Sequence, residues 1–325
     1  MHKHTSYVVA LLACLLSALP PAASGQSYPS RPIRVIVPVG QGGGFDLLGR
    51  VVASKLGDRL GQQVVVENRP GAGSLIGTEA VAKAPHDGYM ILVGGLTNMA
   101  LNAGLYKNLP YDPVGDFKPL SLSVNYSLCL LTRKDLPQTT LKDVIGFARS
   151  NPGKLTYASA GVGTAQHVAL ALLAHLTGTN MVHVPYKGAG AAHTDMLAGR
   201  VDLFFNNCGV IKQFVDSGQM KLIAVSWRER TPTFADVPTV IETGVADFAL
   251  DSWIGFFIGA RTPQPVIEKL RTEIAAVLAL PEISARLERD GGRLLRLSPA
   301  ESEAFVQAEV KKWRASIPQM GISAE

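Results

Sequence analysis

The sequence predicts an α/β protein with two lobes, each built from a mostly parallel β-sheet flanked by helices. Short apolar runs alternate with helical patterns along most of the chain, which is typical of parallel strands covered on both faces. Glycine-rich turns repeatedly separate such a run from the helix that follows it. With 325 residues, the chain also exceeds the roughly 250–300 residues at which a single hydrophobic core stops growing, so two lobes are expected.

The amino-terminal third repeats one order of elements: a β-branched apolar run, a glycine-rich turn and a helical pattern. We expect strands at 33–39, 63–67 and 89–94, and helices that begin near Asp46 and span 75–83.

The middle of the chain continues this order. Thr164 is a suitable N-cap for the apolar helix that follows it, and Gly178 is a suitable residue to end that helix. We expect strands at 155–159, 181–185, 201–205 and 221–225, and helices at 165–176 and up to Leu197.

The carboxyl-terminal part is predicted to be helical. Two amphipathic helices are expected at 265–279 and 282–289. The sequence Ser298-Pro299-Ala300-Glu301 combines a capping box with a proline at the first helical position, and so predicts the start of the last helix.

The first 25 residues predict a secretory signal peptide. A short basic start, Met1–Lys3, precedes the apolar run 8–19, and small residues lead to an expected cleavage site after Gly25. This run is too short to span the roughly 30 Å of a bilayer core, so we expect an exported, periplasmic protein. Cys14 follows Leu-Leu-Ala, a faint lipoprotein-like pattern that leaves lipidation open.

Two cysteines remain after cleavage, Cys129 and Cys208, each in an apolar strand-like run. Export permits a disulfide, but a chain of this size does not need one. The sequence therefore favours two buried, unpaired cysteines that pack as small hydrophobic side chains.

Composition and motifs exclude several classes of protein. The chain is 47% hydrophobic, and its bases are scattered despite a formal charge of +5, so neither disorder nor nucleic-acid binding is expected. No metal-binding histidine pattern, phosphate-binding loop or hydrolase elbow occurs. The GxGxxxG variant at 71–77 lacks the acidic partner of a dinucleotide site. We predict no metal and no cofactor.

Four glycine-rich turns, at 40–44, 71–74, 160–164 and 188–190, each precede a predicted helix. Such turns expose backbone N–H groups beside the positive end of a helix dipole, where a carboxylate can bind without arginine or lysine. We therefore expect a cleft for a small organic anion, with Ser159 and Thr164 as the leading side-chain donors. Lys187, the base that directly precedes the fourth turn, is expected to be a solvated loop residue.

Several segments resemble the substrate-binding proteins of tripartite tricarboxylate transporters, the TctC or Bug receptor family. They cover nearly all of the mature chain in order: 28–38, 42–46, 66–73, 85–89, 157–161, 184–188, 237–239 and 252–255. The resemblance implies a two-lobed "Venus flytrap" of the type II periplasmic-binding class. Lobe 1 would combine 26–124 with 252–325, lobe 2 would span 125–251, and the chain would cross near 121–131 and 251–258.

This family captures small organic anions, usually carboxylates, for a separate membrane permease. The resemblance thus implies a monomeric receptor with a permease as its partner. Together with the second glycine turn, it implies that the cleft is lined by Gly42, Gly43, Gly44, Phe45, Asp46, Gly73, Ser74, Thr97, Asn98, Ser159, Gly163, Thr164 and Asn206.

Two departures from the family pattern bear on the ligand. Val39, Gln41 and Phe45 stand where the family usually has smaller residues, and Asn206 stands where an aspartate is common. Both changes favour an anion with an apolar or aromatic body over an amino acid, although Phe45 is equally suited to wall packing.

Two alternatives stay open. One is an exported enzyme that uses Asp46 or His167 as a base, and the other is a ligand sensor for a signalling partner. The receptor is favoured over the enzyme because no spacing in the sequence indicates a titratable pair.

Overall fold

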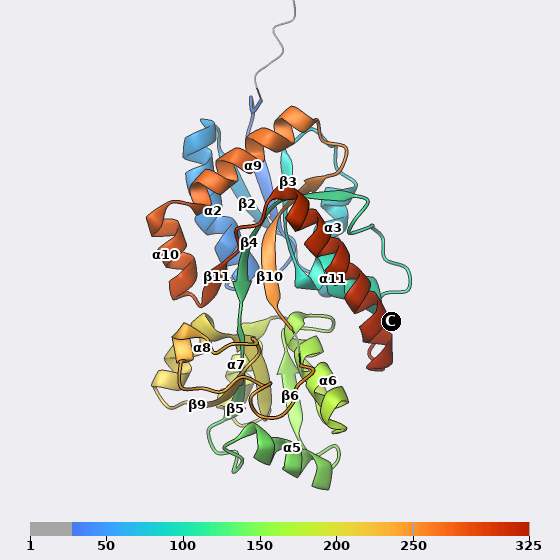
Figure 1. The fold of residues 1–325 in the computed structure, drawn as a ribbon, viewed down its shortest axis with the longest axis vertical. Coiled ribbons are helices and arrows are strands. Elements are labelled where there is room, and N and C mark those ends of the chain that lie inside the picture. The colour runs from blue at the N-terminus through green and yellow to red at the C-terminus, as the bar shows by residue number, and fades with distance from the viewer. Residues whose placement is uncertain (1–27, 249, 325) are drawn as a thin grey trace, which may run out of the picture.

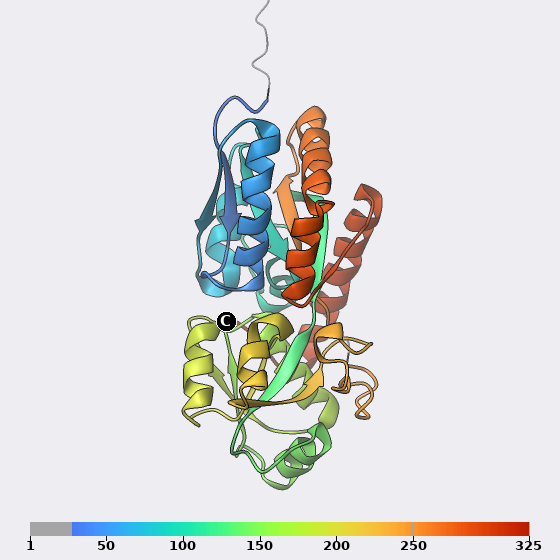
Figure 2. The same ribbon diagram turned by 90° about the vertical axis from the view of Figure 1, so that its left-hand side faces the viewer.

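The computed structural model describes residues 28–248 and 250–324. The predicted signal peptide lies outside the described residues. Two α/β lobes are stacked end to end in an elongated molecule, as Figures 1 and 2 show. Within the described part of the chain, no helix is long and apolar enough to cross a membrane.

Lobe 1 is built around a six-stranded sheet in the order β11-β4-β10-β3-β1-β2. Its strands are β1 (Ile33–Val37), β2 (Val64–Asn68), β3 (Met90–Gly95), β4 (Phe117–Tyr126), β10 (Ser252–Gly259) and β11 (Gly292–Leu294). Strands β1, β2 and β3 are parallel, whereas β10 runs antiparallel to both β3 and β4.

Helices cover both faces of this sheet (Figure 1). One face packs against α2 (Gly44–Leu60), α9 (Gln264–Leu278) and α10 (Pro281–Arg289). The other packs against α3 (Leu75–Ala82), the π-helical turn η2 (Leu96–Leu101), α4 (Asn102–Leu105) and α11 (Pro299–Gln319). The short turn η1 (Ala72–Ser74) leads into α3.

Lobe 2 is built around a five-stranded sheet in the order β7-β6-β8-β5-β9. Its strands are β5 (Leu128–Arg133), β6 (Thr156–Ser159), β7 (Val182–Pro185), β8 (Leu203–Asn207) and β9 (Met220–Val225). Its helices are α5 (Leu141–Ser150), α6 (Ala165–Thr177), α7 (Ala189–Leu197), α8 (Cys208–Asp216) and the short turn η3 (Pro232–Phe234). Helices α5 and α6 share one buried cluster, and α7 and α8 share another.

Both sheets are mixed because the strands that leave the lobe junction run against their neighbours. The chain passes from the first sheet to the second at Ser127, between β4 and β5, and returns to the first sheet at Ser252. Strands β5 and β10 thus start where β8 and β3 end, and each runs antiparallel to that neighbour. The residue boundaries predicted for the lobes stay a prediction.

The expectation of unpaired cysteines was wrong: Cys129 and Cys208 form a disulfide. Cys129 lies opposite Asn206 in the β5–β8 pairing, and Cys208 follows directly as α8 begins. The strand pairing brings the two Cα atoms to 5.1 Å within one buried cluster, and this geometry suits a disulfide. Because the two cysteines are 79 residues apart in the sequence, no local pattern predicted that they would pair.

Candidate functional site

The carboxyl ends of the parallel strands in the two sheets face each other across the lobe junction. In lobe 1, the antiparallel pairing of β10 with β3 places Gly95, near the end of β3, opposite Ile254, near the start of β10. In lobe 2, Leu128 at the start of β5 pairs with Asn207 at the end of β8. The loops that follow β1 to β3 and β6 to β8 therefore meet where the chain crosses between the lobes, the usual place for a ligand in such sheets.

The first glycine loop brings the amino terminus of α2 to this junction. The N-cap residue is Gly43, which has no side chain with which to cap the N–H groups of the first turn. A methyl group on Gly44 would lie 3.2 Å from Ile254 Cδ1, and one on Gly95 would lie 2.9 Å from Phe45 Cζ. The loop thus packs on β3 and β10 and leaves Phe45 half-buried.

Asp46 holds this loop together from inside. Its carboxylate accepts hydrogen bonds from Gly42 N–H at 3.1 Å, Arg50 Nε at 3.1 Å and Asn68 Nδ2 at 2.9 Å. Burial alone raises the pKa of Asp46, but the bonds from Arg50, Asn68 and Gly42 outweigh it, and the pKa lies below its ordinary value. Asp46 is therefore an ionised anchor for the loop.

The second glycine loop is strained and pinned. Ala72, Gly73 and Ser74 all have left-handed backbones, with φ of 45°, 61° and 75°. Non-glycine residues in this conformation cost of order 1–3 kcal/mol each and persist only where their surroundings hold them. Here the three carbonyls accept bonds from Tyr106 OH at 3.2 Å, Asn102 Nδ2 at 3.0 Å and Thr78 Oγ1 at 2.8 Å, respectively.

The turn after β3 contributes one free hydroxyl. Both polar atoms of the Asn98 side chain already have partners, since Oδ1 accepts from Gly95 N–H at 2.9 Å and Nδ2 donates to Thr78 Oγ1 at 2.9 Å. By contrast, the hydroxyls of Thr97 and Ser74 make no hydrogen bond to any described residue. Both side chains therefore keep a proton for a ligand.

In lobe 2, Ser159 and Thr164 shape the loop between β6 and α6. Thr164 Oγ1 donates to the Gly161 carbonyl at 2.8 Å and caps α6 by accepting from His167 N–H. Ser159 Oγ lies 3.0 Å from the same carbonyl and 2.7 Å from His183 Nε2, and Ser159 is fully buried. Each hydroxyl has one proton, and both protons have acceptors inside the loop.

Stacked imidazoles lie beneath this loop. The ring centroids of His167 and His183 are 3.9 Å apart, and Gly163 N–H donates to His167 Nδ1 at 3.2 Å. Burial lowers the pKa of His167 to about 3, with His183 adding to the shift, and burial lowers the pKa of His183 to about 4. Both rings are neutral at neutral pH, and the His167 lone pair at Nδ1 is occupied.

Asn206, at the end of β8, is tied to its own lobe. Its Nδ2 lies 2.8 Å from His193 Nε2, and its Oδ1 accepts from Asn207 N–H at 2.8 Å. Burial lowers the pKa of His193, so the Asn206 amide faces a neutral ring.

The structure brings the second and third glycine loops together across the lobes. A methyl group on Gly73 would lie 3.3 Å from the Val162 carbonyl, and one on Gly163 would lie 3.1 Å from Leu105 Cδ1. No spacing in the sequence predicted the buried partners that hold these loops, because they come from separate elements: Thr78, Asn102, Tyr111 and His183.

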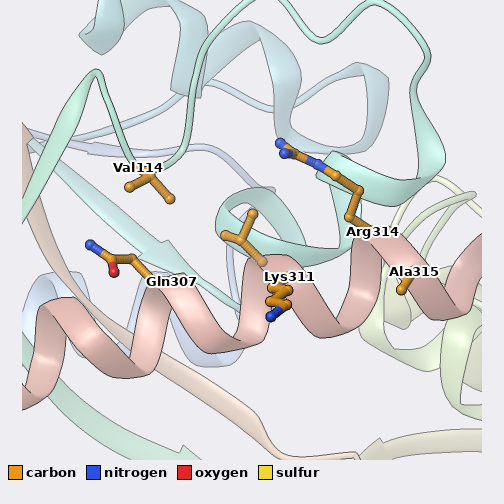
Figure 3. A pocket seen from close by; sticks show the side chains of 6 residues that line it. Val114, Gln307, Lys311, Arg314 and Ala315 are labelled. Atoms are coloured by element: carbon orange, nitrogen blue, oxygen red, sulfur yellow. The ribbon is translucent and has the colours of Figure 1, made fainter.

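No group of three or more His, Cys, Asp or Glu side chains in the described part of the chain is arranged to hold a metal ion. A surface pocket of about 370 Å³ lies between α11 and the loop that carries Val114 (Figure 3). It is lined by Val114, Gln307, Val310, Lys311, Arg314 and Ala315 and contains none of the predicted site residues.

Comparisons with known proteins point to one family. Residues 48–322 match the family described as "Tripartite tricarboxylate transporter family receptor". The chain is 34% identical to the "UPF0065 protein in tcbD-tcbE intergenic region" of Pseudomonas sp. (strain P51), over 92% of this chain and 89% of that protein.

Two solved structures share its fold over nearly their full length. The periplasmic binding protein BugD is 34% identical with a TM-score of 0.85, and the match covers 91% of this chain and 99% of BugD. R. palustris Rpa4515 with adipate is 31% identical with a TM-score of 0.86, again over 91% of this chain and 99% of that one.

Proposed function

Because the chain belongs to the family of tripartite tricarboxylate transporter receptors, we propose that it captures a small organic carboxylate outside the cytoplasm and delivers it to a membrane permease of the tripartite type. The observation that carries this proposal is the position of three glycine loops at the facing carboxyl ends of the two sheets, with the second and third loops in contact across the lobes. In this function the protein acts as a monomer without its signal peptide.

Backbone groups hold the carboxylate in this proposal. Helices α2 and α6 both begin at the junction, and each adds the positive end of its dipole to the N–H groups of its first turn. Arg50 is occupied by Asp46, and Lys187 lies exposed in the loop after β7. The free hydroxyls of Ser74 and Thr97 complete the donor set.

The same residues disfavour an amino acid as ligand. A bound ammonium group needs a free carboxylate, but Asp46 is paired with Arg50, and position 206 holds an amide tied to His193. Phe45, half-buried beside Gly95, offers an aromatic surface to the body of the ligand.

Ligand binding closes the two lobes in this proposal, with the predicted boundaries 26–124 plus 252–325 and 125–251. The chain crosses between the sheets at Ser127 and again before Ser252, and these two crossings serve as the hinge. A ligand held by loops of both lobes favours the closed state.

The exported enzyme remains a second candidate because of one observation, the 2.7 Å contact between Ser159 Oγ and His183 Nε2. A hydroxyl beside an imidazole is the start of a nucleophilic pair, but Ser159 is fully buried. Incubating the protein with each bound carboxylate and following the acid by NMR separates the candidates: a receptor leaves it unchanged, and turnover that Ser159→Ala abolishes identifies an enzyme.

The function is tested by identifying what the protein binds. Mass spectrometry of small molecules released from the purified protein should find a carboxylic acid, and a thermal-shift screen of carboxylates should reproduce the binding. A ligand at 100 times its Kd adds about 2.7 kcal/mol to the free energy of unfolding. Stabilisation by amino acids or sugars, with no response to any carboxylate, would contradict the proposal.

A further inference from the structure

A buried polar network supports the ligand loops of lobe 1. Asn102 Nδ2 donates to Tyr111 OH, which in turn donates to the Asn98 carbonyl. Asn98 Nδ2 donates to Thr78 Oγ1, which in turn donates to the Ser74 carbonyl. The side chains of Asn102, Asn98 and Thr78 are fully buried. The network thus joins the strained turn 72–74 to the turn after β3.

One atom of this network has no partner. Asn102 Oδ1 is buried and accepts no hydrogen bond from any described residue. The orientation of the amide is fixed, because both protons of Asn102 Nδ2 are used, on the Gly73 carbonyl at 3.0 Å and Tyr111 OH at 3.1 Å. Tyr111 OH gives its own proton to the Asn98 carbonyl. Turning the Asn102 amide over would therefore place its Oδ1 against two acceptors, the Gly73 carbonyl and Tyr111 OH, and both bonds would be lost.

This acceptor lies between the glycine loops of the two lobes. Methyl groups built on Gly73 and Gly163 would lie 3.9 Å and 3.8 Å from Asn102 Oδ1. Both glycines have a left-handed backbone, with φ of 61° and 80°, so the buried oxygen is bordered on these two sides by residues without side chains. The structure therefore holds an unused acceptor where the loops proposed to bind the carboxylate come together.

We propose that Asn102 determines specificity by accepting a hydrogen bond from a hydroxyl group of the ligand, so that the receptor selects hydroxy-substituted carboxylic acids; this inference rests on the proposed function. A buried acceptor without a partner is destabilising, and a ligand hydroxyl removes that penalty as it binds. A hydroxyl suits the neutral amide oxygen, whereas an ammonium group would lack a free carboxylate, because Asp46 is paired with Arg50.

Three matched pairs of acids test the inference by calorimetry: succinate with malate, adipate with 3-hydroxyadipate, and phenylacetate with mandelate, each hydroxy acid as separate enantiomers. In any pair that binds, one enantiomer of the hydroxy acid should bind about tenfold to a hundredfold more tightly than the plain acid. Equal affinities within a binding pair overturn the inference and leave the receptor function standing. If none of these acids and no carboxylate of the wider screen binds, the proposed function fails and the inference fails with it.

Variants then assign the preference to Asn102. Asn102→Leu removes the acceptor, and the affinity ratio within a pair should fall to about one. Thr78→Val breaks the same network elsewhere, so it should weaken both members of a pair equally and keep the ratio. A ratio that survives Asn102→Leu overturns the assignment. Should that variant not fold, Asn102→Ala and the wild-type ratios decide the question.

Discussion

Gly209 of lobe 2 packs directly on the Asp290 carbonyl of lobe 1, so closely that a methyl group on Gly209 would lie 2.0 Å from that oxygen. Gly209 follows the disulfide residue Cys208 in the first turn of α8, and Asp290 caps the end of α10. The neighbouring Gly292 pairs with Tyr126, the last residue of β4 before the chain crosses. The two lobes therefore touch, backbone against backbone, beside the hinge.

Gly209→Ala should force the lobes apart at this contact. Overpacking of this kind typically costs about 1–3 kcal/mol, so the melting temperature should fall and the ligand-free radius of gyration measured by small-angle scattering should rise. Gly146→Ala is the matched control, because Gly146 lies within α5 with nothing within 4 Å of its added methyl. It should stabilise the protein by about 0.5–1 kcal/mol. If both variants behave alike, Gly209 does not set the lobe spacing.

Thr97→Val should weaken carboxylate binding with little change in stability. The Thr97 hydroxyl has no partner among the described residues, and a bond from it to a charged ligand is worth about 1.5–3 kcal/mol, or roughly tenfold to a hundredfold in Kd. Calorimetry with the identified ligand measures the loss.

Thr132→Val serves as its control, since the Thr132 hydroxyl is also unpartnered but lies buried in β5. That change should leave binding unaltered and hold or raise the melting temperature. Thr164→Val differs from both, because it removes the cap of α6 and should cost about 1 kcal/mol of stability. Unchanged affinity in Thr97→Val would remove this hydroxyl from the site.

Stability should decrease as the pH falls below about 6.5. Burial lowers the pKa of His167 to about 3 and of His183 to about 4, whereas histidines in the unfolded chain titrate near 6.5. Between the folded and unfolded pKa values, the unfolded chain binds protons that the folded chain does not. The free energy of unfolding therefore falls as the pH falls through this range, by at most about 1.4 kcal/mol per histidine and pH unit.

Urea unfolding between pH 7 and pH 4 measures this slope. His183→Gln can keep a hydrogen bond to Ser159 without titrating, and should flatten the slope. His175→Gln changes an exposed residue on the same helix as His167 and should leave the slope as in the wild type. Equal slopes in all three proteins would show that the stacked pair does not govern acid sensitivity.

Removing the disulfide with Cys129→Ala and Cys208→Ala together should lower the free energy of unfolding by about 2–5 kcal/mol. The bond closes a separation of 79 residues between the first strand of lobe 2 and the helix that contacts lobe 1. Thiol titration of the denatured wild-type protein, with its first 25 residues removed, should find no free cysteine. One or two free thiols in fresh protein would contradict the pairing.

The strands and helices that border glycine turns could be predicted from the sequence, because hydrophobic periodicity and capping residues are local signals. Strand β1 begins at the predicted residue. Helix α6 has its predicted cap at Thr164 and ends as predicted at Gly178, which has a left-handed backbone. Helix α5 was not predicted, although the sequence contains the capping box that Thr140 and Asp143 form at its start.

The chemical state of the site was less predictable, because it depends on partners distant in sequence. The sequence offered Asp46 as a base and Ser159 as a donor, but Asn68 and Arg50 occupy the first, and Gly161 and His183 occupy the second. Asn102 had no local pattern at all. Its role follows only from a network that joins four elements of lobe 1.

The position of β10 also dictates an order of assembly. Residues 252–259 form a central strand of lobe 1, between β3 and β4, so the sheet that starts at residue 33 stays divided until the last quarter of the chain is available. Lobe 2 has its five strands in one continuous stretch and depends on no such late segment. The half of the protein synthesised first is therefore completed last, and until then its apolar strands remain a substrate for chaperones.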